Sequence, residues 1–180
     1  MGSMLQPGDQ VAFIGGMSVS SVTNERKNGA KVVLESIRVE IVTEQPGYDR
    51  FGKMNSEMGN ILQSYPNIKG VFATDDVMAL DALGIIEKYG LKIPVIGTDG
   101  TIEMLKFIKE EEMSATMAQN PYDMGYLSVE QAMRAIKGEH VEKRIDSGID
   151  IITQENVEDR LSFLTQILKS KEQSFLYGIP

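Results

Sequence analysis

The stretch "GVFATDDVMALDAL", residues 70–83, changes its hydrophobic period within a few positions. Residues 71–73 form a short apolar run typical of a buried strand, whereas the apolar residues between 77 and 85 recur at helical spacing. Asp75 and Asp76 therefore lie where a strand ends and a helix begins.

Two roles are open to this pair of carboxylates. An Asp side chain can accept the free N–H groups of a first helical turn, and its charge suits the positive end of the helix dipole. Alternatively, one carboxylate faces a ligand, because clefts in open α/β sheets lie beyond the carboxyl ends of the strands. The stretch by itself leaves both roles open.

The rest of the chain repeats the same theme of a short apolar strand followed by an amphipathic helix. The expected strand and helix pairs are 10–15 with 20–35, 38–43 with 49–65, 70–73 with a helix to about 89, 94–97 with 101–111, 114–119 with 122–138, and 148–154 with 155–170. This alternation predicts an α/β fold with a doubly wound parallel sheet, flavodoxin-like, in three αβα layers and with right-handed crossovers. Six units are too few for an eight-unit barrel.

The expected domain is a single α/β lobe over residues 10–170. Residues 1–9 are interpreted as a cloning scar and linker, and residues 171–180 as a tail or the start of a linker to a further domain. The opening "MGSM" followed by polar residues does not resemble a signal peptide and indicates that an upstream portion is missing. No apolar run reaches the roughly 18 residues that a membrane span needs.

Composition excludes several function classes. A net charge of −8 repels phosphate backbones, so nucleic-acid binding is not expected. The chain has no cysteine and one histidine, His140, which we interpret as a solvated loop residue. A metal site or a Ser-His-Asp triad is not expected, because either would have to be built around this single histidine. A nucleotide cofactor is not expected either, because the spacing of Gly15 and Gly16 matches neither the P-loop nor the dinucleotide-binding fingerprint.

Polar groups follow several strands and describe one wall of a ligand cleft, although ordinary turns and caps would also place polar residues there. Arg26, Asp75, Asp99 and Gln119 combine a guanidinium, two carboxylates and a carboxamide. Such groups orient a neutral, hydroxyl-rich small molecule without chemistry.

Four spaced motifs carry a resemblance to a known family. They are "NERKNGA" (24–30), "VFATDDVMALDAL" (71–83), "IPVIGTDGT" (93–101) and "SATMAQNPYDMG" (114–125). Their order resembles that of periplasmic sugar-binding proteins of the ribose/galactose type (type I periplasmic binding proteins), whose fold LacI-type repressors share. The resemblance covers residues 10–157 and only the second, carboxyl-terminal lobe of that two-lobed family.

The resemblance implies that Arg26, Asp75, Asp99 and Gln119 hold sugar hydroxyls. It also implies that Asp75 faces the sugar while Asp76 caps the helix. The family often has Asn at position 75 and Gly at position 81, where this chain has Asp, and the extra carboxylate favours ligands richer in donors.

The family's first lobe, which supplies the aromatic wall of the cleft, is absent from the resemblance. We therefore expect this chain alone to bind sugar weakly or undetectably, with a dissociation constant above about 1 mM. Residues 120–147 correspond to the segment that crosses to the other lobe. The apolar face of their helix is expected either to fold back on this sheet or to dock on a second copy in a domain-swapped homodimer.

The function expected from the resemblance is sugar binding, without enzymatic activity, as a lobe of an ABC-transporter solute-binding protein. Its partners are a sugar, a membrane permease and the other lobe. The parent protein is expected to be periplasmic or extracellular and lipid-anchored. The alternatives are an effector domain of a LacI-type regulator, a sugar-sensing receptor, or a small enzyme that uses Asp75 and Asp99.

Overall fold

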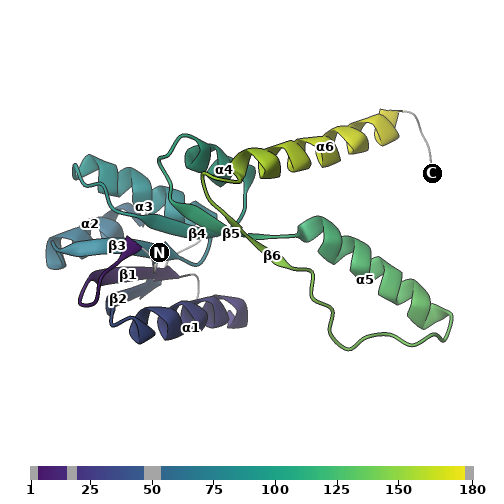
Figure 1. The fold of residues 1–180 in the computed structure, drawn as a ribbon, viewed down its shortest axis with the longest axis horizontal. Coiled ribbons are helices and arrows are strands. Elements are labelled where there is room, and N and C mark those ends of the chain that lie inside the picture. Colours follow the sequence, from purple (N-terminus) through teal and green to yellow (C-terminus); the bar gives the residue numbers. More distant parts are fainter. Residues whose placement is uncertain (1–3, 16–19, 47–53, 177–180) are drawn as a thin grey trace.

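The computed structural model describes residues 4–15, 20–46 and 54–176, without the side chains of residues 46, 54–56 and 168–176. Six strands alternate with six helices in this part of the chain (Figure 1). Their bounds are β1 Gln10–Gly15, α1 Ser21–Ser36, β2 Glu40–Pro46, α2 Met54–Ser64, β3 Ile68–Ala73, α3 Asp76–Lys88, β4 Val95–Asp99, α4 Ile102–Lys109, β5 Ala115–Gln119, α5 Pro121–Ile136, β6 Ile149–Ile152 and α6 Val157–Leu176. Every strand and helix pair expected from the periodicity is present.

The strands form one sheet in the order β2-β1-β3-β4-β5-β6. The first five are parallel, as expected, but β6 runs antiparallel to β5, so the sheet is mixed. The cause is the path of the chain, which leaves the sheet after Gln119 and returns at Ile149, the residue paired with it. A strand that enters at the end where its neighbour finished can only run back along it.

Helices cover both faces of the sheet, which confirms the three-layer fold. Helices α2, α3 and α4 lie on one face and α1 lies on the other (Figure 1). Alternate residues of β3 divide between two cores, with Val71 and Ala73 in the larger one and Phe72 in the core beside α1. Leu5, expected within a linker, is buried in this second core.

Helix α5 leaves the body of the molecule and buries none of its residues (Figure 1). Val129 is 65% exposed and Ile136 is 79% exposed. The expectation that this helix folds back on its own sheet is therefore wrong, because the segments on either side of it lead it past the sheet edge. Docking on a second copy stays a prediction.

Helix α6 begins beside α4, and its first half contacts the larger core (Figure 1). Leu161 and Leu164 pack there as the apolar stripe predicts, whereas the side chain of Leu168 lies outside the described residues. The helix continues to Leu176, so part of the expected tail is helical. In the part of the chain that the structure describes, no helix has the length and apolarity of a membrane span.

Candidate functional site

The two adjacent carboxylates at the start of α3 do not divide their roles as expected. Asp75 has extended backbone angles and is the N-cap of α3, and its Oδ1 accepts a hydrogen bond of 2.8 Å from the Met78 N–H. Asp76 is already the first residue of the helix. The expectation that Asp76 caps α3 is wrong, because the side chain of a cap must precede the turn whose N–H groups it accepts.

Asp76 is instead a fully buried anchor beneath the strand ends. Its Oδ2 accepts a hydrogen bond of 2.7 Å from the Thr101 N–H, and its Oδ1 accepts one of 2.6 Å from the Thr116 hydroxyl. A Cβ at Gly97 would lie 2.5 Å from this Oδ1, so glycine makes room for the carboxylate. Asp76 thereby fixes the loop between β4 and α4 against β5.

Arg26 reaches from α1 to the ends of β3 and β4. Ser20 caps α1, because its side chain accepts a hydrogen bond from the Thr23 N–H. The guanidinium of Arg26 donates to the Thr74 carbonyl at 2.7 Å and pairs with Asp99 Oδ1 at 3.0 Å.

Asp99 ends β4 in a backbone conformation that side chains rarely adopt, with φ at 138°. Its Oδ1 also accepts a hydrogen bond of 2.7 Å from the Gln119 side-chain amide. Burial raises the pKa of the Asp99 carboxyl and the charge of Asp76 raises it further, while Arg26 and Gln119 partly offset both effects.

Three of the four predicted site residues are thus joined through one carboxylate. Arg26, Asp99 and Gln119 come from α1, β4 and β5, which are far apart in sequence. Asp75 lies one strand end away, next to the Thr74 carbonyl that accepts from Arg26.

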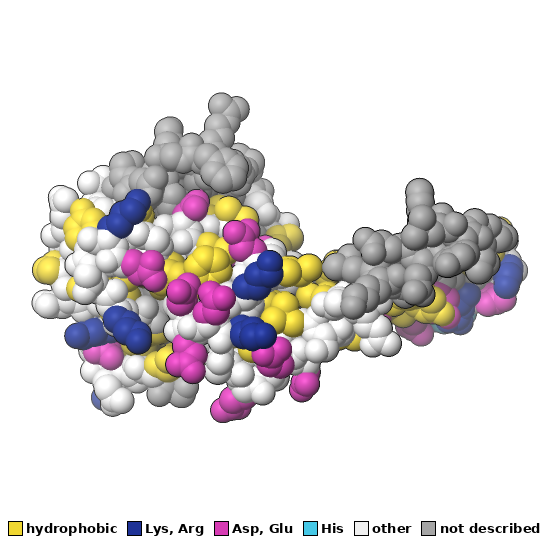
Figure 2. Space-filling model, turned by 90° about the horizontal axis from the view of Figure 1, so that it is seen from above, with side chains coloured by type: hydrophobic (Ala, Val, Ile, Leu, Met, Phe, Trp, Pro, Cys, Tyr) yellow, Lys and Arg dark blue, Asp and Glu magenta, His cyan; other side chains and the backbone are white. Residues whose placement is uncertain are grey.

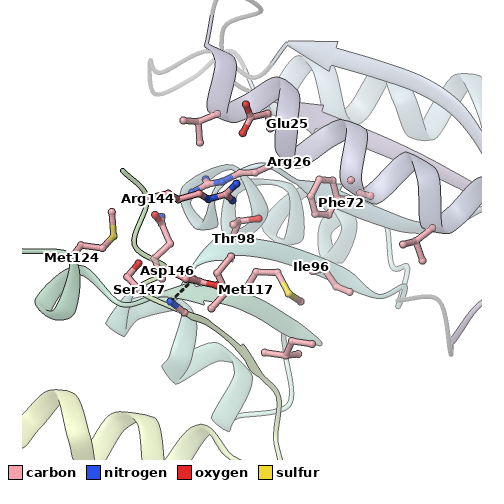
Figure 3. A pocket seen from close by; sticks show the side chains of 18 of the residues that line it. Glu25, Arg26, Phe72, Ile96, Thr98, Met117, Met124, Arg144, Asp146 and Ser147 are labelled. Atoms are coloured by element: carbon pink, nitrogen blue, oxygen red, sulfur yellow. Dashed lines mark hydrogen bonds between the residues drawn. The ribbon is translucent and has the colours of Figure 1, made fainter. Parts of the chain in front are cut away.

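A cavity of about 770 Å³ opens beside these strand ends, between α1 and the segment that leads into β6. Figure 3 shows Arg26 and Arg144 pointing into it, with Phe72, Ile96 and Met117 along its wall. Arg26, Thr98 and Gln119 line its polar end, whereas Asp75 and Asp99 are not part of the lining.

The side chains of the site are suited to hydrogen bonding. Arg26 supplies donors, Asp99 supplies acceptors and Gln119 supplies both. The side chain of His140 is 81% exposed, as expected for a solvated loop residue. Within residues 4–15, 20–46 and 54–176, no group of three or more His, Asp or Glu side chains is placed to hold a metal ion.

Arg160 was missed by the sequence analysis, although it contacts the backbone of Gln119 at 2.6 Å. A signal for it exists in the sequence. Arg160 shares helical spacing with Val157, Leu161 and Leu164, and an arginine on the apolar face of a helix indicates a buried partner.

Comparison with known proteins identifies the family. A family model described as a periplasmic binding protein domain matches residues 1–140. The chain belongs to this family. The periplasmic binding protein fold predicted from the four motifs is therefore confirmed.

Individual periplasmic binding proteins match over about half their length. The chain is 38% identical over 151 residues to the "Ribose import binding protein RbsB" of Bacillus subtilis (strain 168), which covers 83% of this chain and 49% of that protein. It is 34% identical over 122 residues to the "D-allose-binding periplasmic protein" of Escherichia coli (strain K12), covering 66% of this chain and 39% of that protein. The chain spans about half the length of the curated relatives it matches.

A solved periplasmic binding protein has the same fold. An ABC transporter periplasmic solute binding protein from Actinobacillus succinogenes 130z, with bound D-allose, superposes with a TM-score of 0.80 at 26% identity. The match covers 84% of this chain and 55% of that one.

The raised pKa of Asp99 predicts a pH-dependent effect of Asp99→Asn. The folded chain holds the Asp99 proton at pH values where the unfolded chain has lost it, so this contribution to stability is lost as pH rises through the raised pKa. We expect the free energy of unfolding of Asp99→Asn, relative to the unmodified chain, to increase between about pH 4 and 7. Urea denaturation across this range measures it.

The control is Asp81→Asn, which changes an exposed carboxylate on α3. The increase with pH should be larger for Asp99→Asn than for this control. A difference for Asp99→Asn that is constant, or that decreases with pH, would contradict a raised pKa.

Proposed function

We propose that this chain is the carboxyl-terminal lobe of a two-lobed sugar-binding protein that delivers its ligand to a membrane ABC permease. The observation that carries the proposal is the hydrogen-bonded set of Arg26, Asp99 and Gln119 at the carboxyl ends of the sheet. Relatives of about twice the length, named for ribose import and D-allose binding, support the same ligand class and favour transport over gene regulation.

Each site residue has a role suited to a neutral sugar. Arg26 donates to ring or hydroxyl oxygens while Asp99 holds it in place, and the free lone pairs of the carboxylate accept sugar hydroxyls. Gln119 donates to one hydroxyl and accepts from another. Asp75 sits at the adjacent strand end, and we propose that it accepts a further hydroxyl in addition to capping α3.

The second wall of the cleft would come from the other lobe. Residues 120–147 would cross to it, which gives α5 a partner for its exposed apolar side chains; these include Tyr126, Val129, Met133 and Ile136. Closure of two lobes about this crossing would exclude water from the sugar. In the chain alone, the same face would pair with a second copy and form a homodimer.

The proposed role requires neither catalysis nor a cofactor. The relatives are named as binding and import proteins, and one as periplasmic. We place the parent protein outside the cytoplasmic membrane, in the periplasm or attached to the cell surface by a lipid.

Titration of the isotope-labelled chain with ribose, allose, galactose, glucose and inositol tests the proposal. In two-dimensional amide NMR spectra, we expect one sugar class to shift signals near Arg26, Asp75, Asp99 and Gln119. Because one wall is missing, the dissociation constant should exceed about 1 mM, which corresponds to a binding free energy of about −4 kcal/mol.

Two variants make the titration decisive. Asp99→Asn replaces an acceptor that also orders Arg26 and should abolish the shifts, whereas Asp81→Asn should leave them unchanged. Shifts that survive Asp99→Asn would show that the site lies elsewhere. Micromolar affinity in calorimetry would contradict the requirement for a second wall.

A further inference from the structure

Arg160 is a nearly buried cation at the start of α6, with 8% of its surface exposed. One terminal nitrogen donates to Asn120 Oδ1 at 2.9 Å and to Asp150 Oδ2 at 3.1 Å. The other donates to the Gln119 carbonyl at 2.6 Å. The ring of Phe163 lies 5.7 Å from the guanidinium carbon, so an aromatic side chain also covers the charge.

The three acceptors lie on both sides of the point where the chain leaves and re-enters the sheet. Gln119 ends β5, Asn120 begins the departing segment and Asp150 belongs to the returning strand β6. Asn120 itself donates to the Ser147 carbonyl at 3.1 Å. Figure 1 shows α6 starting where β6 ends, beside this crossing.

Gln119 connects this crossing to the candidate site. Its carbonyl accepts from Arg160, and its side-chain amide donates to Asp99, which in turn pairs with Arg26. A continuous series of hydrogen-bonded groups therefore runs from α6 to the ligand-facing end of α1.

We infer that Arg160 is a positioning residue, which ties α6 to the crossing of β5 and β6 and thereby orients Gln119 in the sugar site. The identity of the ligand as a sugar rests on the proposed function, whereas the positioning of Gln119 by Arg160 rests on the contacts alone. A role in stability alone explains the geometry less well. Asp150 is half exposed and would be solvated without Arg160, and the buried Arg160 Nε has no hydrogen-bond partner among the described residues.

The test compares Arg160→Met with Lys109→Met. Lys109 pairs with Glu158 at 2.8 Å and also ties α6 to the body. It is exposed and lies at the C-terminal end of α4, whereas the start of α4 follows the strand end that carries Asp99. In NMR spectra of the chain without ligand, we expect Arg160→Met to shift the Gln119 side-chain amide signals and to speed their exchange with solvent. Lys109→Met should leave them unchanged.

The sugar titration is a second readout. Affinity should fall about two- to thirtyfold in Arg160→Met, the range in which residues that act through a neighbour modulate binding. If the unmodified chain binds no sugar, the proposed function fails, but the Gln119 amide signals still decide the role of Arg160.

A third variant covers the case in which Arg160→Met does not fold. Arg160→Lys keeps the charge but cannot donate to three acceptors at once, so it should produce a smaller shift of the same Gln119 signals. Unchanged Gln119 signals in the folded Arg160 variants, or equal changes in Lys109→Met, would overturn the inference.

Discussion

Gly100→Ala is expected to lower the free energy of unfolding by about 3 kcal/mol, through backbone strain and a steric clash. Gly100 has φ at 78°, a left-handed conformation in which a side chain is disfavoured. A Cβ there would lie 2.3 Å from the Ala118 Cβ and 2.8 Å from its Cα. The second atom is backbone of β5, so no side-chain rotation relieves the clash, and the loop after β4 must move.

Gly90→Ala is the matched control for this effect. Gly90 has a similar φ of 70°, but nothing lies within 4 Å of the position that its Cβ would occupy. Its substitution should cost only about 1 kcal/mol, the penalty of the left-handed conformation. The difference between the two variants in urea denaturation isolates the clash with β5, and equal losses would contradict it.

The substitution at Gly100 should also disturb the site. Asp99 precedes Gly100 and pairs with Ala118 across the sheet, so displacement of the loop moves the carboxylate away from Arg26 and Gln119. We expect NMR shifts at Arg26 and Gln119 in Gly100→Ala but not in Gly90→Ala.

The sequence predicted the layers of this fold because periodicity reports which residues are buried. Strand β1 has the expected bounds, 10–15, and the other elements differ by a few residues at their ends, except α6, which ends later. The expected start of the second helix, residues 49–53, lies outside the described residues. Periodicity carries no information on strand direction. The antiparallel direction of β6 follows from the path of the chain through α5, which periodicity does not report.

The hydrogen bonds that join the predicted site residues could not be read from the sequence, and their role in ligand binding stays a prediction. The motifs named Arg26, Asp99 and Gln119, which the fold brings together. The motifs assigned the helix cap to Asp76 instead of Asp75. Either of two adjacent aspartates could cap a helix, and only the backbone angles of Asp75 show which residue precedes α3. Arg160 was missed because its acceptors, two side chains and one backbone carbonyl, lie 10 to 41 residues away in sequence.

Asp76→Ala is expected to be the most destabilising single change at the site, at about 4 kcal/mol. The substitution leaves the fully buried Thr116 hydroxyl and the Thr101 N–H without their acceptor, and it opens a void beside Gly97. Thr101 is the N-cap of α4, so the start of that helix loses its attachment to α3. Urea denaturation measures the loss.

Asp76→Asn separates the effect of the Asp76 charge from the effect of the space that its side chain fills. The amide fills the same space and keeps one acceptor, so it should cost about 1 to 2 kcal/mol. It also removes the charge that contributes to the raised pKa of Asp99, so that pKa should fall, as followed by the carboxyl carbon shift during an NMR pH titration. Asp81→Ala, on the exposed side of the same helix, should change neither quantity. An unaltered Asp99 pKa in Asp76→Asn would mean that burial alone raises it, and Asp76 would then act on the site only through the loop that it holds.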